Sequence, residues 1–251
     1  MIELKTSSEI ETIKEAGKIV SEILRKVKEN LKSGVTTKDL EKIAEKEMSK
    51  MNVESAFFGY RGFPGKICVS INEELVHGIP NEKRIIKEGD IVKIDIGIKY
   101  KGFYGDIAET IPVGNISDEV RKLLNVTRNC FDKVLKVCYE GYRIGDISAA
   151  IQNYVEENGF SVIRDFVGHG IGRKLHEKPE IPNFGERGTG PLLNNGMVLA
   201  IEPMVSMGSW KVKVLPDGWT VQTIDKKMCA HYEHMIAITE NGPDILTRFF
   251  E

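Results

Sequence analysis

Residues 89–106 read GDIVKIDIGIKYKGFYGD and predict a β-hairpin. Alternate positions of the first strand are apolar, so Asp95 faces the other side of the sheet from Val92, Ile94, Ile96 and Ile98. A turn at Lys101-Gly102 would bring the chain back. If the turn centres there, Gly97 pairs with Asp106, which then shares a face with Asp95 and lies diagonally across from it. The hairpin therefore places two carboxylates close together on one surface.

The pattern around this hairpin occurs a second time in the chain. The tripeptide His77-Gly-Ile precedes the first strand, and His169-Gly-Ile precedes a similar run from Gly196 to Glu202. In both copies of the pattern a carboxylate lies six residues after a glycine, at the end of a run rich in Val and Ile: Asp95 after Gly89, and Glu202 after Gly196. Another carboxylate follows downstream in each copy. The resulting set comprises four acids and one histidine: Asp95, Asp106, Glu202, Glu233 and His169. Such a set is poorly suited to a core and well suited to binding two divalent metal ions.

The order helix, helix, strands also occurs twice. A first helix starts at the capping box Ser8-x-x-Glu11 and ends at Ser33-Gly34, and Thr37 caps a second helix. A short strand is expected at Lys66–Asn72, helices at Glu119–Cys138 and Ile147–Asn158, and strands and loops over 160–251. No Pro-, Gly- or Ser-rich linker separates the halves. We expect one α+β domain over residues 1–251, made of two similar halves with the site between them.

Composition excludes several classes of protein. A content of 41% hydrophobic and 29% charged residues is typical of a soluble globular chain, and the net charge of −2 with interleaved signs predicts no nucleic-acid surface. The four cysteines show no CxxC spacing, which argues against a zinc site or a disulfide framework. No apolar run has the length of a membrane span, and the first residues lack the apolar stretch of a signal peptide. We expect a cytoplasmic protein with no membrane partner.

The four acids define the expected chemistry. Buried carboxylates on neighbouring strands repel one another, and two divalent cations would cancel their charges, with neutral His169 as a fifth ligand. Oxygen-rich ligation with one histidine favours Mn, Fe(II) or Co over a structural zinc. Five ligands for two metals require bridging carboxylates, and metals so close can share one water and lower its pKa. The expected reaction is hydrolysis.

Each of these signals has a simpler interpretation. Asp95 alone would most often be a solvated residue on the polar face of a strand. The glycines around His169 also suit a turn or, with a low prior, an anion-binding loop. His231 lies on the same strand face as Glu233 and His234 on the other, and both are expected to support the site or the structure rather than bind metal.

The chain resembles the type I methionine aminopeptidases, in their short bacterial form, over essentially its whole length. The motifs that carry the resemblance are CVSINE at 68–73, HGIP at 77–80, Ile94-Asp95, Gly105-Asp106, GHGIGR at 168–173, LHEKP at 175–179, Gly196-Met197, IEPM at 201–204 and YEH at 232–234. Their order and spacing are those of the family. The long insertion of type II enzymes is absent.

This resemblance implies a fold, a site and a reaction. The fold is the pita-bread fold, an antiparallel sheet covered by helices with pseudo-twofold symmetry. The metal ligands are the five residues selected above, while His77 and His176 bind substrate and stabilise the transition state, and Glu202 is both ligand and proton acceptor. The methionine pocket consists of Tyr60, Phe63, Cys68, Leu175 and Trp219. Relatives often have Phe at the position of Leu175 and Tyr at that of Phe63.

The implied reaction removes the initiator methionine from nascent chains whose second residue is small (Gly, Ala, Ser, Thr, Cys, Pro or Val). Attack by a metal-bridging water or hydroxide on the first peptide bond would perform it. We expect a monomer that meets nascent N-termini near the ribosome exit. Two alternatives remain: an X-Pro aminopeptidase or prolidase, which usually has an additional N-terminal domain, and a non-catalytic relative that binds ribosomes or nucleic acid. The match of the pocket residues argues against the first, and the five intact ligands argue against the second.

Overall fold

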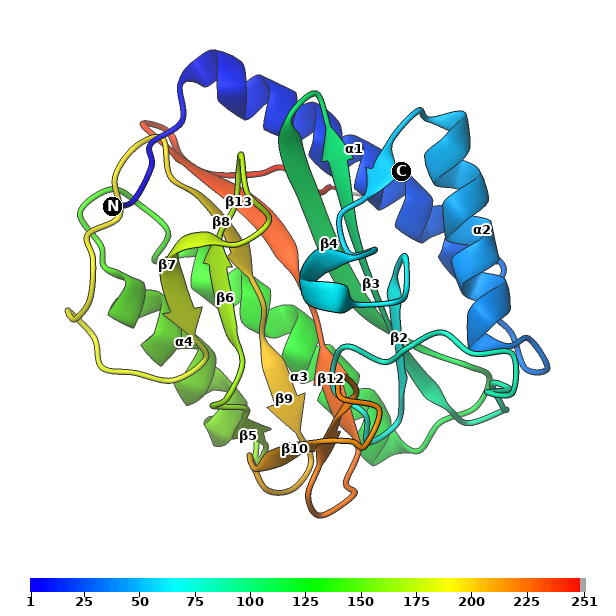
Figure 1. Ribbon diagram of the computed structural model, residues 1–251. Coiled ribbons are helices and arrows are strands. Elements are labelled where there is room, and N and C mark those ends of the chain that lie inside the picture. The colour runs from blue at the N-terminus through cyan, green and yellow to red at the C-terminus, as the bar shows by residue number, and fades with distance from the viewer. Residues whose placement is uncertain (249–251) are drawn as a thin grey trace.

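The hairpin forms with the register that the sequence predicts in the computed structural model, which describes residues 1–248 (Figure 1). Strands β3 (Ile91–Tyr100) and β4 (Phe103–Pro112) are antiparallel and joined by a turn at Lys101-Gly102. Gly97 pairs with Asp106 as expected. Strand β3 continues for five residues beyond Asp95, as the alternation through Ile98 predicts. It can do so because Ile96 and Ile98 continue the apolar face, and both are fully buried.

Strand β3 is the centre of a four-stranded antiparallel sheet. It pairs with β4 on one side and with β1 (Glu54–Ser55) and β2 (Cys68–Ile71) on the other, β2 being the strand expected around 66–72. Helix α1 (Ser7–Glu29) packs against β3 and β4, and α2 (Thr37–Lys50) packs against α1. The apolar face of β3 is thereby covered by helical side chains, and Asp95 faces away from this core.

The second half of the chain forms the remaining sheets, again with antiparallel pairing throughout the described residues. The larger one has the order β14-β13-β8-β6-β7, with bounds Gly242–Ile245, His234–Thr239, Val198–Ile201, Val167–Gly170 and Glu177–Pro182. A three-stranded sheet has the order β12-β9-β5, with bounds Cys229–His231, Met204–Ser206 and Ser161–Val162. A two-stranded ribbon consists of β10 (Val212–Val214) and β11 (Val221–Thr223). Strands and loops therefore follow residue 160 as predicted, up to residue 248.

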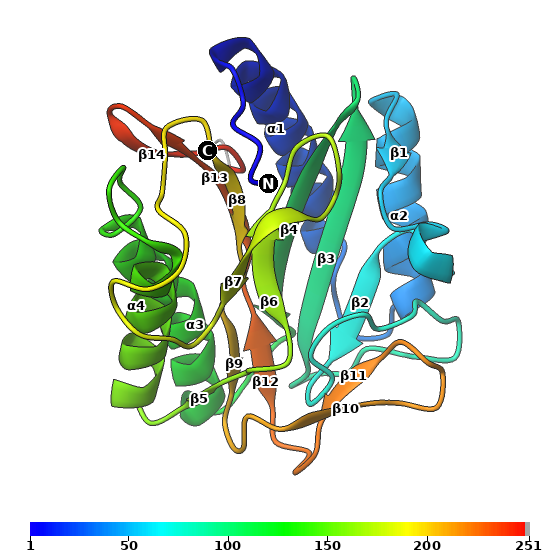
Figure 2. The same cartoon turned by 60° about the vertical axis from the view of Figure 1, so that its left-hand side comes forward.

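Helices α3 (Asp118–Leu135) and α4 (Ile144–Glu157) cover these strands. Helix α4 contacts β5 and β7, and α3 contacts β9 and β12. The pairs α1–α2 and α3–α4 lie on different sides of the strands (Figure 2). The predicted α+β class, antiparallel sheets covered by helices, is confirmed. No helix within residues 1–248 is long and apolar enough to cross a membrane.

The helix starts differ from the prediction by one to three residues, the largest difference being α4, which begins at Ile144 instead of Ile147. Helix α3 ends at Leu135 and α1 at Glu29, a few residues before their predicted ends. Helix α1 is capped by Thr6, whose hydroxyl accepts from Glu9 N at 3.3 Å while the Glu9 carboxylate accepts from Thr6 N at 2.8 Å. This pair has the same spacing as the predicted Ser8 and Glu11, and only one of the two can start the helix. Thr36, rather than Thr37, caps α2.

A pair of main-chain hydrogen bonds joins the two halves near the predicted site. Glu233 N donates to Ala108 O at 2.8 Å, and Ala108 N donates to Glu233 O at 3.4 Å. Ala108 lies on β4 directly opposite Asp95. The C-terminal segment that carries Glu233 is therefore held against the hairpin that carries the two aspartates.

Candidate metal centre

The five predicted ligands come together in one cavity of about 510 Å³, although they are spread over 139 positions of the sequence, from 95 to 233. Each comes from a different strand or strand end: Asp95 on β3, Asp106 on β4, His169 on β6, Glu202 directly after β8 and Glu233 between β12 and β13. Antiparallel pairing sets their mutual positions, because Asp106 is fixed by the hairpin, His169 lies opposite Ala200 near the end of β8, and Glu233 is held against β4.

Burial makes these carboxylates costly when they are charged. Asp106 and Glu233 are only 3% and 2% exposed. Burial raises the pKa of Asp95 to about 7, and burial together with the neighbouring carboxylates raises the pKa values of Asp106 and Glu233 well above their ordinary range. The pKa of Glu202 is raised in the same direction by burial. Four acids in one place thus resist ionisation unless a cation compensates them.

Several oxygens of this group are buried without a hydrogen-bond partner in the described chain. They are Asp95 Oδ1, Asp106 Oδ1 and Glu233 Oε1. Buried polar atoms without a partner are uncommon in native proteins and indicate a bound ion or water. Ligand atoms of Asp106, His169 and Glu233 all lie within 4.8 Å of one another, as do those of Glu202, His231 and Glu233. The donors present therefore fit divalent cations.

His169 is oriented for ligation through Nε2. Its Nδ1 lies 2.9 Å from the carbonyl oxygen of Gly170, to which it can donate, and its Nε2 lies 3.2 Å from Glu202 Oε1. Burial lowers the pKa of His169 to about 3, so the ring is neutral near neutral pH. A neutral imidazole whose other nitrogen donates to a backbone carbonyl is the usual form of a metal-binding histidine. The geometry does not favour the anion-binding interpretation, because His169 lies within a strand rather than at the start of a helix.

His77 and His176 enter the same cavity from two loops. The pKa of His77 is lowered to about 4, mainly by burial and further by the nearby His231 and His176. The pKa of His176 is lowered to about 4 by burial and by the charge of Arg61. Both rings are therefore neutral near neutral pH. The Tyr60 hydroxyl lies 2.8 Å from His176 Nδ1, and His77 has a left-handed backbone, with φ of 59°. Such a conformation is uncommon for a residue other than glycine and is concentrated at functional sites.

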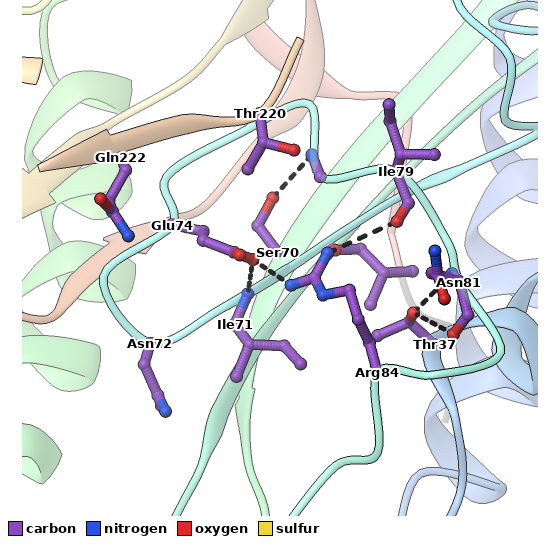
Figure 3. A network of polar contacts seen from close by, with 12 residues as sticks. Thr37, Ser70, Ile71, Asn72, Glu74, Ile79, Asn81, Arg84, Thr220 and Gln222 are labelled. Atoms are coloured by element: carbon purple, nitrogen blue, oxygen red, sulfur yellow. Dashed lines mark hydrogen bonds and ion pairs between the residues drawn. The ribbon is translucent and has the colours of Figure 1, made fainter. Parts of the chain in front are cut away.

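A polar network holds the His77 loop in this conformation (Figure 3). Gly78 N donates to Ser70 Oγ at 3.0 Å, and Ile71 N donates to the Glu74 carboxylate at 2.8 Å. Arg84 forms an ion pair with Glu74 and donates to Ile79 O at 3.4 Å (Figure 3). The loop is thus bonded on both sides of His77.

A buried lysine links this loop to the strand before Glu233. Lys93 is 2% exposed, and its ammonium donates to Asn72 O at 2.5 Å and to Cys229 O at 2.9 Å. Burial lowers its pKa. Asn72 begins the loop that carries His77, and Cys229 begins β12. The sequence places Lys93 on the face of Asp95, but its burial and its partners were not predicted.

The five residues predicted for the methionine pocket line the cavity beside the acids: Tyr60, Phe63, Cys68, Leu175 and Trp219. The rings of Phe63 and Trp219 pack edge to face, with centroids 5.2 Å apart. Cys68 lies opposite Asp95 across β2 and β3, and burial raises the pKa of its thiol well above the ordinary range. The cavity is also lined by Phe166 and Met204, which were not predicted. Their positions in the sequence could have indicated them, since Phe166 lies two residues before the GHG motif and Met204 directly follows IEP.

The remaining two histidines separate as strand parity predicts. His234 is turned away from the acids and bonds to Thr247 Oγ1 and to the Tyr232 hydroxyl, both at 2.8 Å. His231 lies with the acids, its Nε2 3.5 Å from Glu202 Oε2. The contacts of His234 fit the structural role expected of it. His231 lies closer to the site carboxylates than the sequence indicated.

Known proteins resemble the chain over nearly its whole length. The model of metallopeptidase family M24 matches residues 11–240. The methionine aminopeptidase 1 of Bacillus subtilis is 54% identical over 99% of this chain and 100% of its own, and the methionine aminopeptidase of Escherichia coli is 39% identical over 98% and 94%. The crystal structure of methionine aminopeptidase from Thermotoga maritima superposes with a TM-score of 0.97 at 51% identity, covering 99% of this chain and 100% of the other.

The prolidase of Pyrococcus horikoshii superposes less closely, with a TM-score of 0.78 at 25% identity, and the match covers 64% of that longer chain. These neighbours confirm the pita-bread fold predicted from the motifs. The chain belongs to metallopeptidase family M24 and, within it, to the methionine aminopeptidases.

Proposed function

We propose that this chain removes the N-terminal methionine from nascent proteins whose second residue is small (Gly, Ala, Ser, Thr, Cys, Pro or Val). The observation that carries the proposal is the meeting of four carboxylates, two buried and two largely buried, and His169 with a pocket of aromatic and sulfur-bearing side chains in one cavity. A metal-dependent hydrolase needs the first feature, and an enzyme selective for a thioether side chain needs the second. The proposal also rests on the family to which the chain belongs.

Two divalent cations, Co, Mn or Fe(II), would be held by the oxygens of Asp95, Asp106, Glu202 and Glu233 and by His169 Nε2. When bound, they would polarise the peptide carbonyl and lower the pKa of a shared water. Oxygen-rich ligation suits these ions better than it suits a structural zinc. The buried oxygens without partners are the atoms that such ions would satisfy.

The proton transfers are assigned to residues of the chain. Glu202 accepts a proton during hydrolysis, since its Oε1 and Oε2 face the centre between two imidazoles. His77 and His176, both neutral, donate hydrogen bonds to the carbonyl oxygen of the first peptide bond as it gains negative charge. When the Tyr60 hydroxyl donates its hydrogen bond to Nδ1 of His176, the single ring hydrogen of the neutral imidazole is on Nε2. The methionine side chain enters the pocket formed by Phe63, Trp219 and their neighbours.

The proposal also covers the domain organisation of the chain, its oligomeric state, its location and its partners. Residues 1–251 form a single catalytic domain of two similar halves, because each half contributes two carboxylates and neither half completes the cavity alone. The enzyme works as a monomer in the cytoplasm, on N-termini close to the ribosome exit. Nucleic acid and membranes are not partners.

Hydrolysis of Met-Ala-Ser and of a matched Xaa-Pro peptide tests the proposed function. Protein treated with a chelator should be inactive on both, and added Mn, Co or Fe(II) should restore activity on Met-Ala-Ser alone. Metal analysis of protein prepared without added cobalt identifies the ion and its stoichiometry. A preference for the Xaa-Pro peptide, or full activity after complete metal removal, would refute the proposal.

A further inference from the structure

His231 is the least explained residue of the cavity. It ends β12, two residues before Glu233, and the residue is only 1% exposed. Neither ring nitrogen has a hydrogen-bond partner in the part of the chain that the structure describes. At least one nitrogen of a buried imidazole normally has a hydrogen-bond or metal partner. For His231 that partner would have to be an ion or a water, because the described chain supplies none.

The geometry around Glu202 relates His231 to His169. Glu202 Oε1 lies 3.2 Å from His169 Nε2, and Glu202 Oε2 lies 3.5 Å from His231 Nε2. The His231 nitrogen is also 3.9 Å from Glu233 Oε2. One carboxylate therefore has an imidazole nitrogen beside each of its oxygens.

These separations are those of atoms that share a cation. Ligand atoms lie about 2.0–2.2 Å from a first-row divalent ion, so two of them at tetrahedral or right angles are about 3.0–3.5 Å apart. The two distances from His231 Nε2 are at or slightly beyond this range. A small movement of the ring or the carboxylates on binding would bring all three atoms to one ion.

We propose that His231 is a sixth protein ligand of the dinuclear centre, bound through Nε2, so that each cation has one imidazole. This inference rests on the proposed function, which assigns the centre five ligands and only one histidine. The ligand atoms form two groups that share Glu233: Asp106, His169 and Glu233 in one, and Glu202, His231 and Glu233 in the other. Each group would hold one cation, and Glu233 would contribute to both.

The backbone of His231 is prepared for this role. Thr110 Oγ1 accepts from His231 N at 2.8 Å and donates to His231 O at 2.7 Å. Thr110 lies on β4 opposite Lys93, and His231 pairs with Met204 on β9. The main chain is thus held on both sides, which limits the movement of the ring to its own torsions.

A different role is a hydrogen bond from His231 Nε2 to Glu202 without ligation. Glutamine at this position distinguishes the two, because its amide can donate to a carboxylate but does not replace an imidazole ligand. His231→Gln is therefore the central variant. His169→Gln removes the histidine already assigned as a ligand, and His176→Gln is a matched control from the same cavity that is not expected to bind metal.

Proton NMR of the protein loaded with Co(II) counts coordinated imidazoles directly, through their exchangeable, strongly shifted N–H signals. The wild type should give two such signals, His231→Gln and His169→Gln one each, and His176→Gln two. Calorimetric titration with Co(II) should show that one ion binds about tenfold or more weakly to His231→Gln than to the wild type. Loss of a residue that merely hydrogen-bonds to a metal ligand already lowers metal affinity by about that factor.

Several outcomes overturn the assignment of His231. A single signal in the wild type that disappears in His169→Gln leaves the five-ligand centre intact and makes His231 a hydrogen-bonding residue. Two signals retained in His231→Gln, with unchanged affinity for Co(II), have the same meaning. Failure of the wild type to bind Co(II) refutes the proposed function itself, and the role of His231 with it.

Discussion

The hydroxyl of Tyr60 lies 2.8 Å from Nδ1 of His176, and the two rings are tilted against each other with centroids 5.2 Å apart. The His176 ring also packs edge to face with that of His169, with centroids 4.3 Å apart. Tyr60 therefore contacts a ring that sits between the methionine pocket and the metal centre. This relationship connects substrate binding to the group proposed to stabilise the transition state.

Replacing Tyr60 with Phe should test that connection while keeping the pocket wall. A hydrogen bond is worth about 1 kcal/mol net, so kcat should fall about fivefold with little change in KM. His176→Ala should cost about 10²–10³ in kcat with unchanged metal stoichiometry. In the double variant the Tyr60 effect should disappear, because its partner is gone. Additive effects of the two substitutions would contradict the connection.

Glu202→Ala should abolish turnover and weaken metal binding. The substitution removes both a proposed ligand and the proposed proton acceptor, and leaves the neighbouring imidazoles without their carboxylate. Glu180→Ala is a matched control, since Glu180 lines the same cavity but is exposed. Rates on Met-Ala-Ser and the metal content of both variants decide the matter. A Glu202→Ala enzyme that kept a tenth of wild-type kcat would show that the assignment is wrong.

The metal-free protein should lose stability as the pH rises above about 6.5. The site carboxyls have raised pKa values, about 7 for Asp95, so in the folded state they hold protons to a higher pH than in the unfolded state. The stability that this contributes is complete below their ordinary pKa near 4 and is lost as the pH passes the folded value. The histidines of the cavity act in the opposite direction, but only between about pH 3 and 6.5, where their folded and unfolded pKa values lie.

Thermal unfolding of chelator-treated protein at pH 6.5 and 7.5 measures this effect. The melting temperature should be lower at pH 7.5 without metal, and saturating Mn or Co should remove the decrease, because the cations compensate the ionised carboxylates. Metal binding at pH 7 should also release protons, which calorimetry in buffers of different ionisation enthalpy detects. A melting temperature without metal that rises over this interval would contradict the burial of the acids.

Selectivity for methionine should exceed what hydrophobicity alone provides. The pocket is bounded by the edge-to-face pair Phe63 and Trp219, by buried Leu175 and by the Cys68 thiol, which suits an unbranched thioether better than a branched chain. Apolar pockets distinguish one methylene by only about 1–3 kcal/mol, so norleucine should be cleaved at an intermediate rate. We expect kcat/KM to fall in the order Met, norleucine, Leu for peptides that differ only in the first residue. Equal values for Met and Leu peptides would refute the assignment of the pocket.

The parts of the site that the sequence predicted depend on local rules. The positions of Asp95 and Asp106 follow from strand parity and from a turn at a Lys-Gly pair, and both rules act within eighteen residues. The start of α1 was misplaced because Thr6-x-x-Glu9 and Ser8-x-x-Glu11 have equal spacing, and propensity alone does not choose between them.

What the sequence did not predict depends on contacts between distant segments. The partners of Lys93 are carbonyl oxygens of Asn72 and Cys229, which lie 21 positions before it and 136 after it. Parity placed His231 on the same face as Glu233, but its distance from Glu202 depends on how β12 pairs with β9, the strand that follows Glu202. Backbone carbonyls carry no signature in the sequence, so such partners appear only in the folded chain.

Lys93 provides the last prediction, because its charge is buried without a carboxylate partner within hydrogen-bond distance in the described residues. Lys93→Met keeps the length and apolar stem of the side chain but removes the donor to Asn72 O and Cys229 O. Loss of those bonds destabilises the fold, while removal of a buried charge stabilises it, so the free energy of unfolding should change by no more than about 2 kcal/mol. The loop that carries His77 should nevertheless lose its fixed position.

Small displacements of catalytic groups can lower rates by about 10²-fold, so we expect kcat of Lys93→Met to fall by about tenfold or more while its melting temperature stays close to that of the wild type. Lys99→Met, on the same strand but exposed, is the matched control and should be neutral. Together, kcat on Met-Ala-Ser and the melting temperature separate a positioning role from a structural one. A large loss of stability with unchanged kcat in the remaining folded protein would show that Lys93 supports the fold and not the position of His77.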